Sequence, residues 1–380
     1  MPGEVRSNTI IWLCGIAANK LGGFERHCLE TVRQAAARGC DMLFVFTGPP
    51  SDEIARLIVA SGARWTVVPQ LDALGWRASA RLFRLIARER AILLHLHLCS
   101  LYRPFFVLAG ALGVPIIATY HFSGAPSPPG TVKNLVKRLR RKLFRGSLRA
   151  VTAVSNSARE KLAVDYLVPH HDIRVIYNGT DASAISTETA RLPTGLLFAG
   201  ALIPEKGVAV ALAALRFLRE SGVAATLTIA GDGPDRPRLI ERSRALDLVG
   251  NVEFLGLRDD VPALMQRYPI VVVPSVWDEA FGLVIIEAMA AGCVVVASRI
   301  GGIPEIITHE VDGLLVPAGD AEALAGAVER LLREPALMSR LALQAVATVR
   351  KRFLLTGIVR QYFEVYEALG APPEDALVKG

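Results

Sequence analysis

Several features that would place the protein in a well-known class are missing from the sequence. No apolar run approaches the roughly 20 residues that a membrane-spanning helix needs. The apolar stretch Ile10–Ala18 is too short for that, and only Arg6 precedes it as a basic residue, so we expect a buried strand and not a signal peptide. No G-x-G-x-x-G run is present, so a nicotinamide cofactor has no support.

Cysteine is also scarce. The five cysteines are odd in number, scattered along the chain and without C-x-x-C spacing, which argues against a zinc site and for a reducing compartment. They are Cys14, Cys28, Cys40, Cys99 and Cys293. Together with the short apolar runs, they lead us to expect a cytoplasmic protein, with peripheral attachment to the inner face of the plasma membrane as an open alternative. The Ala- and Arg-rich composition favours a bacterial source.

The charge is unevenly distributed. Residues 1–177 hold 24 Lys and Arg against 11 Asp and Glu, whereas residues 178–380 hold 19 against 25. The net charge of the whole chain is +7. A basic first half suggests that this half meets an anionic molecule or surface.

Short apolar runs alternate with helical patterns in both halves, which predicts parallel sheets covered by helices on both faces. In the first half the candidate strands are Thr9–Gly15, Met42–Thr47, Trp65–Pro69, Ile92–Leu98, Pro115–Tyr120, Ala150–Ser155 and Ile173–Tyr177. In the second half they are Gly195–Gly200, Thr226–Ala230, Val252–Leu255, Ile270–Pro274, Val294–Ser298 and Gly313–Val316. Candidate helices of the second half are Val208–Glu220, Arg236–Ala245, Val261–Gln266, Phe281–Ala291, Pro304–Ile307 and Ala321–Arg333.

The Ala-, Ser- and Thr-rich segment Thr180–Pro193 reads as a linker between two doubly wound α/β domains. We expect an N-terminal domain over residues 1–178 and a C-terminal domain over 179–353. A last helical stretch follows within 354–380. Two such domains place a ligand cleft at the carboxyl ends of their strands.

The most informative stretch runs from Val271 to Ile307. It predicts a buried strand, a loop, a short helix over Phe281–Ala291, and a second buried strand. The helix is apolar on nearly every side but carries Glu287, and Glu279 lies eight positions earlier. A buried carboxylate needs a partner, so Glu287 either pairs within the chain or holds a polar ligand.

This stretch resembles the E-x7-E signature of the family 4 glycosyltransferases, retaining enzymes of the GT-B fold. The run DEAFGLVIIEAMAAG, followed by GGIPEII, makes the match specific. The resemblance implies that Glu287 accepts hydrogen bonds from ribose hydroxyls and Glu279 from the transferred sugar. It also implies that the helix start at Phe281, Gly282 and Leu283 stabilises the departing diphosphate. In the proteins that this chain resembles, the last helix, here within residues 354–380, crosses back onto the first domain.

Further site residues follow the first strands of the two domains. Gly22 and Gly23 open a helix, which lets the backbone approach a phosphate with free N–H groups. They also match the family's GGxE run. In FAGALIPEKGV, Lys206 matches the lysine that grips the donor diphosphate, but Ala201 stands where the family usually has arginine. Asp232, in AGDGPD, matches a family turn or is an ordinary Asx turn.

Three histidines allow more than one interpretation. His121 ends a strand, and is either bonded to backbone or, as the resemblance implies, placed near the donor sugar. His95 and His97 alternate onto one face of their strand. No third metal ligand is evident beside this pair, so we expect satisfied core histidines.

The run Lys133–Arg149 holds eight basic and no acidic residues around apolar positions at helical spacing. Such a basic amphipathic helix suits an anionic membrane, although a solvated helix packed on its own sheet fits equally well. No nucleic-acid-binding module accompanies it.

The combined expectation is a retaining glycosyltransferase that uses a UDP-hexose or UDP-N-acetylhexosamine, with GDP-mannose as the alternative donor. The acceptor would be lipid-linked or a polysaccharide, and neither a metal nor a further cofactor would be required. Ala201 motivates one alternative, a nucleotide-sugar-binding protein with weak or no transferase activity. A GT-B-fold epimerase is another.

Overall fold

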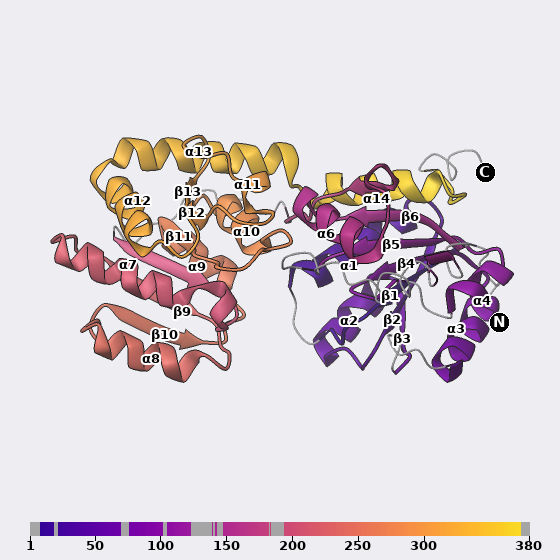
Figure 1. Ribbon diagram of the computed structural model, residues 1–380. Helices are drawn as coiled ribbons and strands as arrows, with labels where there is room; N and C mark the ends of the chain where they lie inside the picture. Colours follow the sequence, from indigo (N-terminus) through magenta and orange to yellow (C-terminus); the bar gives the residue numbers. More distant parts are fainter. Residues whose placement is uncertain are drawn as a thin grey trace. The chain divides into compact units, whose positions relative to one another are not determined.

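The computed structural model describes residues 8–18, 22–69, 76–101, 105–122, 139, 141–142, 147–181, 183 and 194–373. The chain divides into two compact units, one formed by Met1–Tyr177 with Leu355–Gly380 and the other by Asn178–Leu354. Figure 1 shows helices on both faces of the sheet in each unit. Most of the segment Thr180–Pro193 and of the basic run Lys133–Arg149 lies outside the described residues.

In its described part, the first unit contains a parallel sheet in the order β3-β2-β1-β4-β5-β6-β7. The strands are β1 Thr9–Cys14, β2 Asp41–Phe46, β3 Arg64–Val67, β4 Ala91–His97, β5 Ile116–Tyr120, β6 Leu148–Ala153 and β7 Ile173–Val175. The helices are α1 Gly23–Ala36, α2 Asp52–Ala60, α3 Trp76–Glu89, α4 Phe105–Ala111, α6 Asn156–Tyr166 and α14 Leu355–Glu367, with a 3₁₀ turn at His170–Asp172.

The second unit contains a parallel sheet in the order β10-β9-β8-β11-β12-β13. Its strands are β8 Gly195–Ala199, β9 Thr226–Ala230, β10 Val252–Gly256, β11 Ile270–Val273, β12 Val294–Ser298 and β13 Leu314–Val316. Its helices are α7 Val208–Glu220, α8 Arg236–Ala245, α9 Val261–Arg267, α10 Leu283–Ala290, α11 Ile303–Ile306, α12 Ala321–Arg333 and α13 Pro335–Arg352. A 3₁₀ turn, Pro204–Lys206, precedes α7.

The strand positions agree with the sequence patterns to within about two residues. The inner strands, such as β1, β4, β8, β11 and β12, are apolar runs buried along their length, whereas the edge strands β3 and β10 are only partly buried. Two details differ. The short helix expected over Phe281–Ala291 begins later, at Leu283, since Gly282 caps it with a positive φ of 108°. Helix α13 was not anticipated, although Pro335 at its start is a helix-entry signal.

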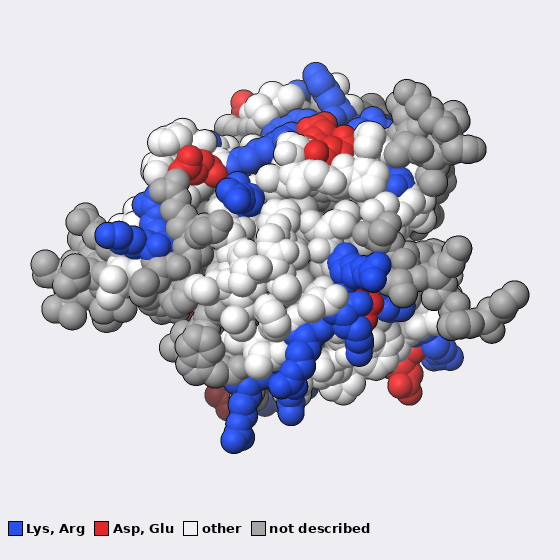
Figure 2. Space-filling view, turned by 90° about the vertical axis from the view of Figure 1, so that its right-hand side faces the viewer, with Lys and Arg blue, Asp and Glu red and all other residues white. Residues whose placement is uncertain are grey.

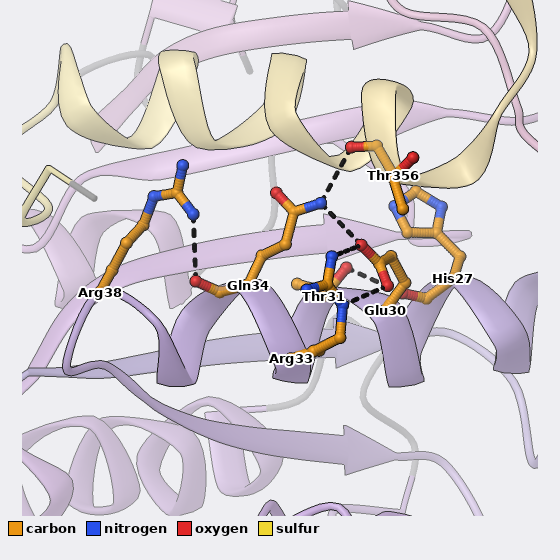
Figure 3. A network of polar contacts seen from close by, with 7 residues as sticks. All are labelled: His27, Glu30, Thr31, Arg33, Gln34, Arg38 and Thr356. Atoms are coloured by element: carbon orange, nitrogen blue, oxygen red, sulfur yellow. Dashed lines mark hydrogen bonds and ion pairs between the residues drawn. The ribbon is translucent and has the colours of Figure 1, made fainter. Parts of the chain in front are cut away.

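Helix α14 comes from the end of the chain but belongs to the first unit, where it packs against α1. Figure 3 shows Gln34 of α1 reaching the backbone of α14, with its Nε2 2.9 Å from the carbonyl oxygen of Thr356. The buried Arg38 pairs with Glu367, at 3.1 Å between Nε and Oε1, and lies over the Phe363 ring. The core of this unit is therefore completed by the last helix.

His27 of α1, labelled in Figure 3, lies inside this core and gives a first prediction. Burial lowers the pKa of His27 to about 4, against roughly 6.5 in an unfolded chain. As the pH is lowered, His27 therefore takes up its proton in the unfolded chain at a higher pH than in the folded protein. Neutral His27 costs the folded state no stability above about pH 6.5. As the pH falls from there toward 4, we expect His27 to lower the free energy of unfolding by about 3 kcal/mol.

Denaturant unfolding at about pH 7 and about pH 5 measures this difference. His27→Phe should lose less stability over this range than the wild-type protein. His171, whose side chain is 83% exposed, provides the matched control, and His171→Gln should follow the wild type. Equal losses in His27→Phe and the wild type would contradict the prediction.

Candidate functional site

In the second unit the candidate residues lie at the carboxyl edge of the sheet, where the strand order reverses between β8 and β11. This reversal is the position at which doubly wound sheets bind ligands. Lys206 follows β8, and Glu279 follows β11. The structure brings these two together, with 2.6 Å between Nζ of Lys206 and Oε1 of Glu279.

Glu279 has a second partner that the sequence patterns did not reveal. The hydroxyl of Ser275, which is fully buried, donates to Oε1 of Glu279 over 2.8 Å. Both residues belong to the loop between β11 and α10, so the serine fixes the carboxylate from within the same loop. In the sequence, the only indication of this role of Ser275 is that a polar residue follows the buried strand β11.

Glycines allow the loops around this ion pair to approach one another closely. A Cβ atom on Gly207 would lie 1.8 Å from the carbonyl oxygen of Pro274, and one on Gly301 would lie 2.5 Å from the carbonyl oxygen of Glu279. The backbone N–H of Gly302 also donates to that oxygen over 2.8 Å. Lys206 and Glu279 are therefore held by backbone packing as well as by their charges.

The remaining candidates of the second unit surround this edge. Glu287 lies half-buried on α10, about one turn after the loop that carries Glu279. Phe281 is buried, and Gly282 and Leu283 form the start of α10. Asp232 accepts a bond from the next N–H, that of Gly233, as in a local turn.

The loops after β8 and β9 are joined by backbone hydrogen bonds. The N–H of Leu202 donates to the carbonyl oxygen of Asp232, and the N–H of Asp235 donates to that of Leu202. Ala201 lies exposed on the first of these loops. Two arginines are candidates to replace the cation that is missing at Ala201. Arg258 makes two contacts to Asp260, and Arg299 is exposed directly after β12.

In the first unit, Gly22 and Gly23 lie at the start of α1, as expected, but the N–H of Gly22 is not free. It donates to Oε2 of Glu25 over 2.9 Å. Burial raises the pKa of Glu25, whose side chain lies at the start of the helix. The expectation of a free donor at Gly22 is therefore wrong for this state, because the glutamate of the same GGxE run occupies it.

His121 follows β5 at the carboxyl edge of the first sheet. Among the described residues it bonds to a side chain: its Nε2 lies 3.1 Å from Nδ1 of His97. Burial lowers the pKa of His121 to about 3. His95 and His97 are fully buried and have hydrogen-bonding partners, as expected of core histidines. Within the described residues, no group of three His, Cys, Asp or Glu is arranged to hold a metal ion.

The close packing at Gly207 gives a second prediction. Gly207 and Gly222 have similar positive φ values, 68° and 73°, but a Cβ on Gly222 would meet nothing within 4 Å. Gly222→Ala should therefore cost only the strain of a left-handed residue, about 1–2 kcal/mol. Gly207→Ala should cost about 1–3 kcal/mol more, because the Pro274 backbone must move. Denaturant unfolding compares the two, and equal costs would contradict the packing argument.

Comparisons with known proteins agree with this architecture. The model of "Glycosyltransferase Family 4" matches residues 21–184, and that of "Glycosyl transferases group 1" matches residues 190–347. Within the described residues, no helix is long and apolar enough to cross a membrane.

Two mycobacterial relatives cover nearly the whole chain. The glycogen synthase of Mycobacterium tuberculosis is 31% identical over 92% of this chain and 91% of its own length. The phosphatidyl-myo-inositol mannosyltransferase of Mycobacterium leprae is 30% identical over 94% of this chain and 96% of its own length.

Among solved structures, Anabaena HepE in complex with UDP has a TM-score of 0.79, with 22% identity over 95% of this chain and all of that chain. The lipopolysaccharide outer core galactosyltransferase WaaB has a TM-score of 0.71, with 17% identity over 94% of this chain and 99% of that one. The chain therefore belongs to the family 4 glycosyltransferases and has their GT-B fold of two Rossmann-like domains.

Proposed function

We propose that this glycosyltransferase moves a sugar from a nucleotide donor to a lipid-linked or polysaccharide acceptor, with retention of the anomeric configuration. The observation that carries the proposal is the Lys206–Glu279 pair at the switch point of the second sheet. A cation beside a carboxylate provides the two groups that a nucleotide sugar needs, one for its diphosphate and one for its hydroxyls.

In the proposed complex, Lys206 and the N–H groups at the start of α10 stabilise the negative charge on the departing diphosphate. Glu279, oriented by Ser275, accepts hydrogen bonds from the transferred sugar. Glu287 accepts them from the ribose. In the first domain, Gly22, Gly23 and His121 are proposed to contact the donor, with Glu25 releasing the Gly22 N–H when phosphate arrives.

The leaving phosphate takes the proton of the acceptor in this scheme, so no protein base, metal ion or further cofactor takes part. Closure of the domains would exclude water and limit hydrolysis. A UDP-sugar is the proposed donor, with a hexose or N-acetylhexosamine as the sugar, and GDP-mannose is the alternative. The solved complexes of Anabaena HepE with UDP and with UDP-glucose support the first.

The positive charge of the first domain supports a lipid-linked or polysaccharide acceptor that is anionic or held at a membrane. Four arginines of α3 are exposed at spacings of three and four residues, namely Arg77, Arg81, Arg84 and Arg88. Figure 2 looks at the side on which α3 and α4 lie in Figure 1, and Lys and Arg cover more of this face than Asp and Glu. Peripheral contact through Lys133–Arg149 remains part of the proposal.

The donor site is tested first by titration calorimetry with UDP, GDP, UDP-glucose and GDP-mannose. We expect one nucleotide series to bind, and Glu287→Ala to weaken that binding about ten- to a hundredfold, because charge-assisted bonds to the ribose are lost. Glu241→Ala removes an exposed carboxylate of α8 and should bind like the wild type. Failure of every nucleotide to bind would overturn the donor site.

The role of Ala201 gives a separate prediction. Ala201→Arg adds a cation beside the proposed diphosphate site and should tighten nucleotide binding about tenfold and raise the rate of transfer. Ala224→Arg adds the same charge ahead of β9, at the opposite edge of the sheet, and should change neither.

A metal chelator added to the transfer assay should leave the rate of transfer unchanged, because no metal ion takes part in the proposed scheme.

Equal behaviour of the two arginine variants would show that Ala201 does not weaken the site. Donor binding without transfer to any acceptor would favour a nucleotide-sugar-binding protein. Interconversion of sugar nucleotides without an acceptor would favour an epimerase.

A further inference from the structure

We propose that Tyr366 of α14 is a positioning residue for His121. Acting through two buried histidines, it fixes the tautomer in which His121 carries its proton on Nε2 and offers Nδ1 as a hydrogen-bond acceptor. The inference rests on the proposed function, because it takes His121 as a residue that contacts the sugar.

A continuous chain of side-chain contacts joins the two residues. Nε2 of His121 lies 3.1 Å from Nδ1 of His97, and Nε2 of His97 lies 3.1 Å from Nδ1 of His95. The same His95 nitrogen lies 2.5 Å from the hydroxyl of Tyr366. That hydroxyl accepts the indole N–H of Trp12 over 3.2 Å. This series of side-chain contacts thus connects the carboxyl edge of the first sheet with α14.

The three histidines and Tyr366 are uncharged near pH 7. Burial, helped by the neighbouring histidines, lowers the pKa of His95 and of His97 well below the usual value. Burial also lowers the pKa of His121 to about 3 and raises that of Tyr366. Each imidazole therefore carries one proton near pH 7, and only its position on the ring is variable.

The proton of the Tyr366 hydroxyl decides that position. The Tyr366 oxygen accepts from the donor-only indole of Trp12, and among the described residues Nδ1 of His95 is the acceptor that its own proton can reach. His95 then carries its proton on Nε2, which lies 2.7 Å from the hydroxyl oxygen of Thr119. Thr119 in turn lies 2.7 Å from the hydroxyl of Thr152.

The same assignment continues toward the edge of the sheet. Nδ1 of His95 has a single lone pair, which the Tyr366 hydroxyl and the Nε2–H of His97 share. A lone pair on Nε2 of His97 would face this lone pair and be repelled, so His97 donates from Nε2 and accepts at Nδ1. His121 then donates from Nε2. Its Nδ1 is left with a lone pair, which suits a sugar hydroxyl that donates a hydrogen bond.

The opposite set of tautomers would also connect these residues by hydrogen bonds, but it leaves the proton of the Tyr366 hydroxyl without an acceptor. If Nδ1 of His95 donated to Tyr366, the tyrosine would accept twice and its proton would have no acceptor among the described residues. Tyr366 is fully buried, and an unused buried donor is costly. Without the Tyr366 hydroxyl, both directions would form the same number of hydrogen bonds, and the bias would disappear.

The test reads the tautomer of His121 directly. Long-range ¹H–¹⁵N spectra of the full-length protein, labelled on histidine, distinguish the two tautomers, and His121→Gln identifies the signal. We expect a single Nε2–H form in the wild-type protein and a mixture in Tyr366→Phe. If Tyr366→Phe does not fold, the wild-type spectrum decides by itself, because a mixture or an Nδ1–H form of His121 there would contradict the assignment.

Tyr268→Phe is the matched control. Tyr268 is a buried tyrosine of the second unit that precedes β11, and its hydroxyl donates to Thr228 over 2.8 Å, so this variant also removes one buried tyrosine hydroxyl. It should keep the wild-type spectrum. A single Nε2–H form in Tyr366→Phe, or a mixture or an Nδ1–H form in the wild type, would overturn the proposal.

Kinetic measurements distinguish a failure of the positioning role of Tyr366 from a failure of the proposed function. Loss of a correctly placed acceptor should lower kcat for transfer about three- to tenfold in Tyr366→Phe, with little change in nucleotide affinity. Tyr268→Phe should keep the wild-type kcat. A changed tautomer with unchanged kcat would overturn the role of Tyr366 in transfer while leaving the nucleotide site intact. Absence of nucleotide binding by the wild type would instead overturn the proposed function, and the spectra would still decide the tautomer.

Discussion

The second domain depends on how closely its loops approach one another at the carboxyl edge of the sheet. Gly207 touches the Pro274 carbonyl, and Gly301 lies against the backbone of Glu279. Backbone-to-backbone contact of this kind leaves no room for a side chain, so the loops after β8, β11 and β12 have one arrangement. The ion pair between Lys206 and Glu279 is a consequence of that arrangement, since both charges are carried to one place by loops that cannot separate. The chemistry proposed for the site thus rests on glycines that take no part in it.

Much of this could be predicted from the sequence. Helices α7, α8 and α12 have the predicted bounds, because turn and capping residues enclose clear helical patterns. The location of Lys206 and Glu279 at one edge followed from parallel topology alone. Helix α13 was missed although its buried residues recur every four positions, at Leu337, Leu341, Ala345 and Val349.

What the sequence could not predict were partners distant along the chain or dependent on side-chain conformation. Whether the Gly22 N–H is free depends on the rotamer of Glu25, which no spacing specifies. The alternation of His95 and His97 indicated that they share a face of β4, but Tyr366, the partner of His95, lies 271 residues away along the chain. Such a contact exists only because the last helix returns to the first domain.

That return has a topological consequence. The second unit, Asn178–Leu354, is an insertion within the first. Its two ends are neighbours, since Thr180 bridges to Leu354 and its N–H donates to the carbonyl oxygen of Phe353 over 2.9 Å. A segment with adjacent ends and its own core has the form of a module that genetic rearrangement can exchange whole. The first unit, in contrast, combines segments on both sides of the second, so its core is complete only after α14 has been synthesised.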